Sequence, residues 1–261
     1  METTTRRTTP PSKLEFSSSE SDLKLPLWGH LEELRKRLFR AAGWIALGMI
    51  VSAGLTGRIL DWIIAPVGSV IYTSPVEPFM VHLKVAFFGG LCFGFPMLMG
   101  EVWGFLKPAM RLRSPDAKPL PIGGLIAVSF ALFLLGGWVA WHFLIPMALD
   151  FLMQFGSEVM VPMLTVDRYI SFVGWIVIGC GFLFQMPIVV IPLTRMGVVT
   201  PQFLVQKWRI ALLGILVLAA IVSPPDLVTQ ILLAIPLVAL YAVSIAVSYF
   251  LKRKGNKRET N

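Results

Sequence analysis

The sequence predicts an all-α polytopic membrane protein with six transmembrane helices and both termini in the cytoplasm. Of its 261 residues, 56% are hydrophobic and only 15% are charged, whereas soluble domains are about a quarter charged. Long apolar segments alternate with polar loops, and a helix of about 20 apolar residues crosses a bilayer. The basic residues gather in alternate loops, and this asymmetry sets the expected orientation.

The N-terminal segment, residues 1–25, is rich in Ser and Thr and has no apolar core typical of a secretory signal peptide. We therefore expect a disordered cytoplasmic tail there. Residues 26–251 form the expected membrane domain, and residues 252–261 form a basic cytoplasmic tail.

The membrane domain opens with His30–Leu38, HLEELRKRL, whose leucines recur at helical spacing. Within it, Glu32 and Lys36 are four residues apart, as are Glu33 and Arg37. One interpretation is two surface ion pairs, each worth a few tenths of a kcal/mol. The other is that a carboxylate faces a groove and accepts a guanidinium from a partner.

The apolar runs give the expected spans and loops. The spans are residues 38–55, 79–105, 119–149, 169–193, 210–223 and 227–251. We expect residues 57–78 as an outer loop because they are rich in proline. The third run exceeds the roughly 30 Å hydrocarbon core and must tilt, kink or project. The fifth run reaches only about 21 Å as a helix. Two short spans are favoured over a re-entrant hairpin, because Arg209 and Lys252 then mark the same side.

The distribution of basic residues predicts the orientation. All but three of the 23 Lys and Arg residues lie in the N-terminal tail with the first motif, in two loops, or in the C-terminal tail. The exceptions are Arg58, Lys84 and Arg168. Cytoplasmic segments carry such an excess, so the net charge of +8 is explained by topology. We expect no nucleic-acid partner.

The motifs of common enzymes are absent from the sequence. It has no phosphate-binding Walker loop, no His-Glu-x-x-His and no Gly-x-Ser-x-Gly. We expect no enzymatic activity, metal or cofactor. Three polar residues lie in expected spans: Lys84, Glu101 and Gln185. Lys84 could extend to the interface, or could form an ion path with Glu101 in a proton-coupled small-molecule transporter. Gln185 could bind another span or a partner helix.

Seven short motifs occur in order between about Pro26 and Leu251. They are HLEELRKRL at 30–38, EPF at 77–79, VWGF at 102–105, IPMA at 145–148, YISF at 169–172, FQMP at 184–187 and PPD at 224–226. The ordered set resembles the TatC family, the polytopic subunit of the twin-arginine protein translocase. The resemblance covers the whole chain except its two tails.

The resemblance implies a cup- or glove-shaped fold of six helices, the last two short, in the bacterial inner membrane. It implies a receptor that binds twin-arginine signal peptides of folded precursors at the cytoplasmic face. Export would be driven by the proton-motive force, with single-span partners of the TatA and TatB type and in a multimeric complex.

The resemblance also implies roles for individual residues. The expected signal-binding residues are Glu33, Arg35 and Phe105. Partner helices would dock at Gln185, Ser223 and Gln230. The outer cap would include Pro66, Glu77, Pro78 and Phe79, with Asp226 in the turn between the last two helices.

Two positions depart from the family pattern. Many relatives carry a second signal-binding Glu where this chain has Ser114, and Asp116 lies two residues further on. Relatives often carry Glu at the position of Gln185. A neutral amide can bind a polar partner but cannot titrate as a carboxylate, so proton carriage at this position is disfavoured.

Overall fold

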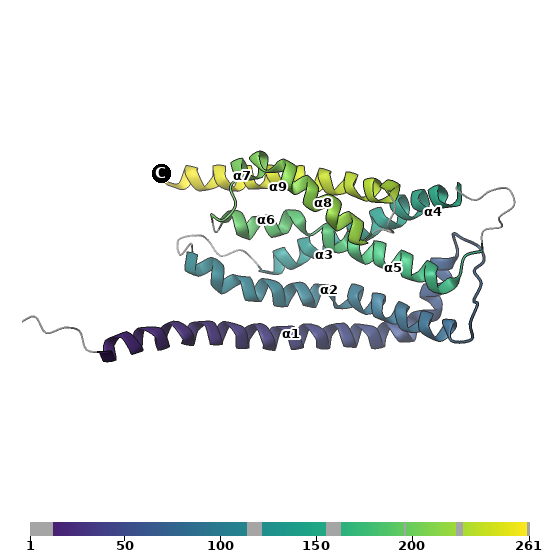
Figure 1. Ribbon diagram of the computed structural model, residues 1–261, viewed down its shortest axis with the longest axis horizontal. Helices are drawn as coiled ribbons and strands as arrows, with labels where there is room; N and C mark the ends of the chain where they lie inside the picture. The colour runs from purple at the N-terminus through teal and green to yellow at the C-terminus, as the bar shows by residue number, and fades with distance from the viewer. Residues whose placement is uncertain (1–12, 114–121, 155–162, 196, 223–226, 260–261) are drawn as a thin grey trace, which may run out of the picture.

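A computed structural model describes most of the chain (Figure 1). The regular elements of the described residues are helices, and one isolated β-bridge pairs Ile71 with Thr165. The described residues are 13–113, 122–154, 163–195, 197–222 and 227–259. Within them, five helical segments are long and apolar enough to cross a membrane. A sixth apolar helix is shorter, as the fifth run predicted.

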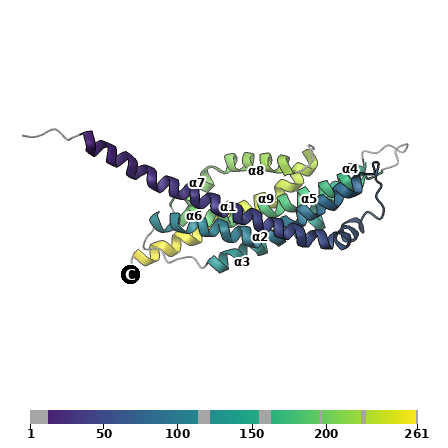
Figure 2. The same cartoon turned by 90° about the horizontal axis from the view of Figure 1, so that it is seen from below.

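Helix α1 (Lys13–Ile64) is longer at both ends than the sequence predicted. Its 52 residues extend about 78 Å, so its first turns project beyond the other helices (Figures 1 and 2). Residues 13–25, expected as disordered tail, are helical, and so are residues 57–64, expected as loop. A residue outside this helix stabilises its last turn, because the Tyr169 hydroxyl donates to the Ile63 carbonyl at 3.0 Å. Pro66 disfavours continuation of the helix beyond this point.

Helix α2 (Glu77–Arg113) packs along α1 through small residues. A Cβ atom at Gly90 would lie 2.8 Å from the Met49 nitrogen and 3.0 Å from the Ile45 carbonyl oxygen. Only glycine permits this approach between two helix backbones. The helix continues to Arg113, so part of the basic segment expected as a loop between the spans 79–105 and 119–149 is helical.

A π-helical turn interrupts the third apolar run, for which the length predicted a tilt, a kink or a projection. Helix α3 (Ile122–Val139) passes through one π-helical turn, η1 (Ala140–Leu144), into α4 (Ile145–Gln154). The Ile145 N–H donates to the Ala140 carbonyl, five residues earlier. Pro146 follows directly, and a proline cannot donate the next helical hydrogen bond.

The fourth run is one membrane-spanning segment, as predicted, but a short turn interrupts its helix. Helix α5 (Val166–Leu183) ends before a turn at Phe184 and Gln185, and α6 (Met186–Arg195) follows. Pro187 explains the break, because its ring would clash with the carbonyl of the residue four positions earlier.

The C-terminal helices form the other side of the bundle. Helix α7 (Pro201–Gln206) leads into the short α8 (Trp208–Val222), and α9 (Leu227–Glu259) continues through Pro236. Helix α9 packs against α6 and α8. It runs past residue 251, so the expected basic tail begins as helix.

Most of the long helices begin and end at two opposite ends of the molecule (Figure 1). The start of α1 and the ends of α2, α6 and α9 lie at one end (Figure 1). At the other end, the loop after α1 pairs with the strand-like residues before α5. The Ile71 N–H donates to the Leu164 carbonyl at 3.0 Å, and the Val166 N–H donates to the Ile71 carbonyl at 2.8 Å. This bridge ties the predicted outer loop to the bundle.

Candidate functional site

A cluster of charged side chains joins α1 to α2 near the end at which α1 starts. Two N–H groups of Arg37, on Nε and Nη2, donate to Glu33 Oε1 at 3.0 and 2.7 Å. Both residues are on α1, four positions apart, as helical spacing predicted. The Glu33 side chain is 38% exposed, so its carboxylate is accessible from water while it holds the guanidinium.

The partner on α2 is Glu101. Arg37 Nη1 lies 3.3 Å from Glu101 Oε2, and Arg40 Nη2 lies 3.1 Å from the same oxygen. The Glu101 side chain is only 16% exposed, and two guanidiniums offset the cost of burying its charge. Two carboxylates and two guanidiniums therefore form one network between the helices.

Sequence reasoning did not assign Arg37, Arg40 and Glu101 to a common site. Glu101 is 64 positions from Arg37 along the chain, so the spacing of residues within one helix could not predict this contact. The available signal was the acid itself within an apolar segment, because such residues are costly unless they are paired.

Gly104 provides the space for the Arg37 guanidinium. A Cβ atom at position 104 would lie 2.2 Å from Arg37 Nη1, so any other residue would displace it. Phe105, an expected signal-binding residue, follows Gly104 on α2 and is half-buried. The structure thus brings the Phe105 segment and the Glu33 pair to the same junction between α1 and α2.

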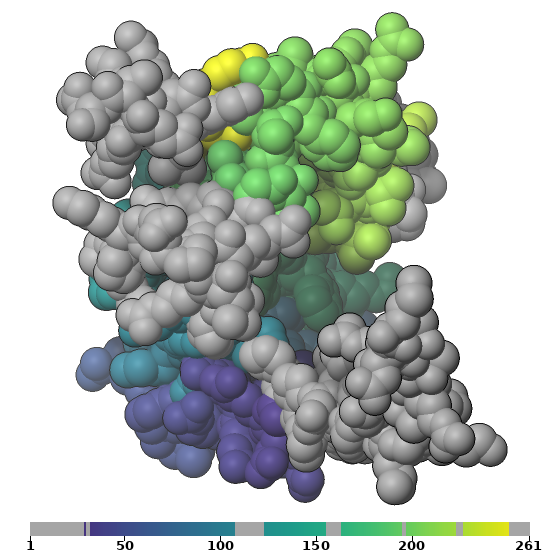
Figure 3. Space-filling model, turned by 90° about the vertical axis from the view of Figure 1, so that its left-hand side faces the viewer, coloured from purple at the N-terminus to yellow at the C-terminus, as the bar shows by residue number. Residues whose placement is uncertain are grey.

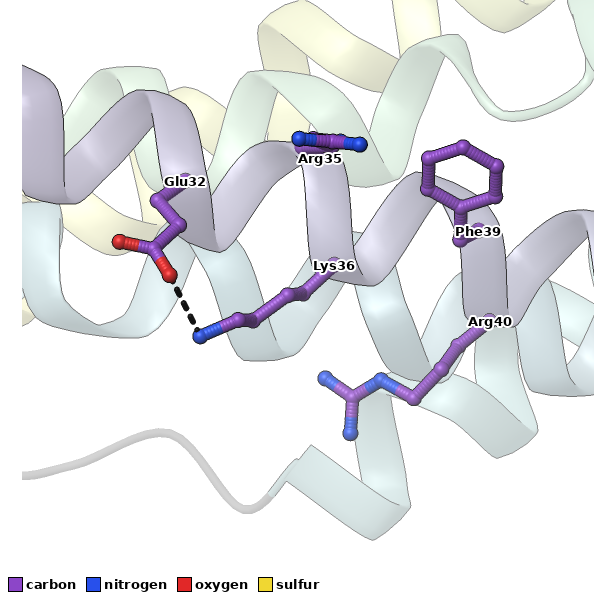
Figure 4. Close-up of a pocket in the computed structure, with 5 residues that line it drawn as sticks. All are labelled: Glu32, Arg35, Lys36, Phe39 and Arg40. Carbon is purple, nitrogen blue, oxygen red and sulfur yellow. Dashed lines mark ion pairs between the residues drawn. The ribbon is translucent and has the colours of Figure 1, made fainter.

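A second feature, which shares Arg40 with the charged cluster, lies on α1 itself. A shallow, open pocket of about 540 Å³ is lined by Glu32, Arg35, Lys36, Phe39 and Arg40 (Figure 4). Lys36 Nζ lies 2.8 Å from Glu32 Oε1, and both side chains are largely exposed. Arg35 lies over the Phe39 ring, with 5.7 Å between its Cζ and the ring centroid. The pocket therefore has three cationic groups, one anionic group and an aromatic face.

Four of the expected site residues lie outside the described residues. These are Ser114, Asp116, Ser223 and Asp226. Their roles stay predictions from the resemblance.

The two expected partner-docking amides make contacts within the bundle. Gln185 Nε2 donates to the Ser129 carbonyl at 3.0 Å and to the Gly181 carbonyl at 3.3 Å. Within the described part of the chain, its Oε1 is buried without a hydrogen-bond partner. Gln230 Nε2 donates to the Leu216 carbonyl at 2.9 Å, which joins α9 to α8.

The expected outer-cap residues lie at the opposite end from the charged cluster. Glu77 accepts from the Thr73 N–H at 3.0 Å, across the turn before α2. The Pro78 carbonyl lies 2.7 Å from His82 Nδ1. Phe79 is 67% exposed, and Pro66 is exposed as well.

Lys84, near this end, does not simply extend to the interface. Its Nζ lies 2.5 Å from Asp167 Oδ1 and donates to Ser171 Oγ at 2.8 Å. Both partners are on α5, so the ion pair ties α2 to α5. Among the described residues, no group of three or more His, Cys, Asp or Glu side chains is arranged to hold a metal ion.

Comparison with known proteins gives a consistent set of relatives. The model of the family described as "Sec-independent protein translocase protein (TatC)" matches residues 29–236. The Sec-independent protein translocase protein TatC of Carboxydothermus hydrogenoformans is 33% identical over 238 residues, which are 89% of this chain and 96% of that protein. TatCd of Bacillus subtilis is 32% identical, over 90% of this chain and 96% of its own length.

Solved structures give the same result for the fold. A crystal structure described as that of the twin arginine translocase receptor TatC matches with a TM-score of 0.75 and 32% identity. The match covers 85% of this chain and 98% of that chain. None of these comparisons supports the alternative of a small-molecule transporter.

Proposed function

The chain belongs to the TatC family of Sec-independent protein translocases, and on that premise we propose that it is the receptor for twin-arginine signal peptides. The observation that carries the proposal is that the Glu33 carboxylate binds a guanidinium. Arg37 donates to it through two N–H groups at 2.7 and 3.0 Å. A signal-peptide arginine offers the same fork of donors.

The position of Glu33 suits a ligand that arrives from water. Its side chain is more exposed than those of Arg37 and Glu101, at 38% against 20% and 16%. Both N–H groups of Arg37 use the same oxygen, Oε1, so Oε2 lies outside this pair. Phe105 follows Gly104 on the adjoining helix, and we infer that its ring would offer an aromatic face to a signal-peptide arginine. Ser114 and Asp116 remain candidates for further contacts.

The partners follow from the same family membership. The chain is a component that works with other Tat subunits, and we infer single-span partners of the TatA and TatB type. Gln185, Ser223 and Gln230 are the candidate docking residues. Among the described residues, the buried Oε1 of Gln185 has no hydrogen-bond partner. A buried acceptor without a hydrogen bond is costly, and this cost favours a donor supplied by a segment outside the described residues.

The location follows from the helices and the loops. The chain has several helices able to span a membrane, which fits a multi-pass protein of the bacterial inner membrane. The start of α1 and the end of α9 lie at the same end of the molecule (Figure 1), and the basic loops favour the cytoplasm for that end. Binding at Glu33 would then present folded precursors for export driven by the proton-motive force, in a complex of several copies.

The experiment is site-specific photocrosslinking in membrane vesicles. A photoreactive residue replaces Leu34, which is 45% exposed and adjoins Glu33 without removing its carboxylate. Precursors carry Arg-Arg or Lys-Lys in the signal peptide. We expect an adduct that needs Arg-Arg, disappears with Glu33→Gln and survives Glu32→Gln, the exposed neighbour paired with Lys36. Adducts of equal yield with Lys-Lys, or in the presence of Glu33→Gln, would contradict the proposal.

A further inference from the structure

We propose that the pocket on α1 formed by Glu32, Arg35, Lys36, Phe39 and Arg40 binds the phosphate headgroup of an anionic phospholipid. The charge of the pocket identifies the class of ligand. Three of its five lining side chains are cationic, and its one acid, Glu32, is already paired with Lys36 at 2.8 Å. Its surplus of positive charge attracts an anion and repels the arginines of a signal peptide.

Arg35 is the cation most available to such a ligand. Among the described residues, it has no carboxylate within ion-pair distance, and its contact is with the Phe39 ring. Arg40 is 58% exposed and Lys36 is 71% exposed, so both can turn their charges toward a phosphate. The side chains come from successive turns of one helix (Figure 4), which gives them a common face.

The surroundings favour a lipid over a free anion. Among the basic residues, Leu38 is 67% exposed and Phe39 is 68% exposed, and the apolar span continues to Ile64. A phosphate held by Arg35 and Arg40 would therefore leave its acyl chains beside exposed apolar side chains. A basic cluster at the end of a membrane helix is typically attracted to anionic lipid, at about 1 kcal/mol for each charge.

The pocket overlaps only in part with the charged cluster of Glu33, Arg37, Arg40 and Glu101. At about 100° per residue, Glu33 and Arg37 lie on the side of α1 that faces α2, and Arg35 and Phe39 lie on another side. Arg40 alone takes part in both, through its contact with Glu101. A lipid in the pocket would fix Arg40 and the start of the span without occupying Glu33. The signal-recognition role implied for Arg35 would then act through an anion rather than through the signal arginines.

The test is lipid binding by the full chain in detergent, followed by native mass spectrometry. The probes are phosphatidylglycerol, phosphatidylcholine and inorganic phosphate. We expect the wild-type protein to retain phosphatidylglycerol. Arg35→Gln should lower the affinity for phosphatidylglycerol by about five-fold, and Arg35→Lys should restore it. The matched control is Lys107→Gln, which removes an exposed charge near the end of α2 and outside the pocket, and should leave the affinity unchanged.

Three results would overturn the proposal. The first is equal retention of phosphatidylcholine, a lipid with a phosphate but no net charge, which would show that the pocket does not select a net anionic headgroup. The second is an equal loss of affinity with Lys107→Gln, which would indicate a diffuse surface effect. The third is phosphate binding that matches lipid binding, which would identify a free anion as the ligand. Thermal unfolding of each variant would exclude loss of the fold as the cause.

Discussion

At the scale of single residues, Arg37 competes with any external guanidinium for Glu33. Its contact with Glu33 is part of the site in the absence of a ligand. Substitution of Arg37 by Gln should therefore raise the affinity for a twin-arginine signal peptide. A partly exposed pair is worth about 0.5–1 kcal/mol, which corresponds to about two- to five-fold. Fluorescence anisotropy with a labelled peptide measures the change. Because a competitor lowers the affinity for every ligand of Glu33 equally, Lys-Lys peptides should gain the same factor.

The check on this prediction uses two glycines of α2. Gly104→Ala should reproduce the gain, because a Cβ atom there would lie 2.2 Å from Arg37 Nη1 and force the guanidinium away. Gly100→Ala, one turn earlier, should change nothing, because its nearest neighbour would be Ile126 Cδ1 at 3.6 Å. Weaker binding with Arg37→Gln would mean that Arg37 orients Glu33 rather than competing for it.

A second residue-scale prediction concerns the ion pair between Lys84 and Asp167. Lys84→Met leaves the Asp167 carboxylate, only 29% exposed, without its cation. We expect a loss of about 1–2 kcal/mol in the free energy of unfolding, below the cost for a fully buried pair because both side chains still reach solvent. Thermal unfolding in detergent measures it. The double variant with Asp167→Asn should lose less than Lys84→Met alone, and an equal or larger loss would argue against this account.

How far the sequence predicted the site depends on the distance between partners. The pairs of Glu32 with Lys36 and of Glu33 with Arg37 follow from helical spacing and are confirmed. The ion pair between Arg37 and Glu101 joins two helices. Residue spacing along a single helix cannot predict such a contact. Gly104 was part of a recognised motif, but its use as space for a guanidinium depends on the α1–α2 contact.

At the scale of elements, the α1–α2 contact depends on Gly90. In a Gly90→Val variant, the new Cβ atom would meet the backbone of Met49 and Ile45, so α1 would have to move. We expect a cost of about 2 kcal/mol in unfolding free energy, measured by thermal unfolding in detergent. Gly54→Ala on α1 is the control, because no atom lies within 4 Å of its added Cβ and alanine favours the helix. Equal effects of the two variants would contradict this close packing.

The sequence predicted which segments are helical better than it predicted where each helix begins and ends. The apolar runs gave the spans, because length and composition decide whether a helix can cross a bilayer. The end of α1 was misjudged, since residues 57–64 owe their helix in part to a contact from Tyr169 on a distant helix. The single span of the fourth run is confirmed, but the sequence did not predict the turn before Pro187, because an apolar run gives no indication of where a proline will be accommodated.

At the scale of the whole molecule, the arrangement of helix ends agrees with the charge pattern. The ends with basic flanking residues lie together, and Figure 3 looks onto that end, with α1 and α2 below the residues of α7 to α9. The sequence predicts this grouping because loops that stay in the cytoplasm retain Lys and Arg. It leaves open the path of the last two helices, since α8 has only 15 residues, and the end of α8 and the start of α9 stop short of the far end (Figure 1).

The start of α9 gives the last prediction. In a background without Cys92 and Cys180, single cysteines replace Thr73, Gly197 or Leu227, all exposed. A membrane-impermeant thiol reagent is added to intact cells, after permeabilisation of the outer membrane where one is present. Two short spans predict labelling at Thr73 and Leu227, with Gly197 protected, because Leu227 then begins α9 on the outer side. A re-entrant hairpin would protect Leu227 together with Gly197, since α8 and α9 would both return to the cytoplasmic face. Labelling at Gly197 with protection at Thr73 would reverse the orientation that the basic loops predict.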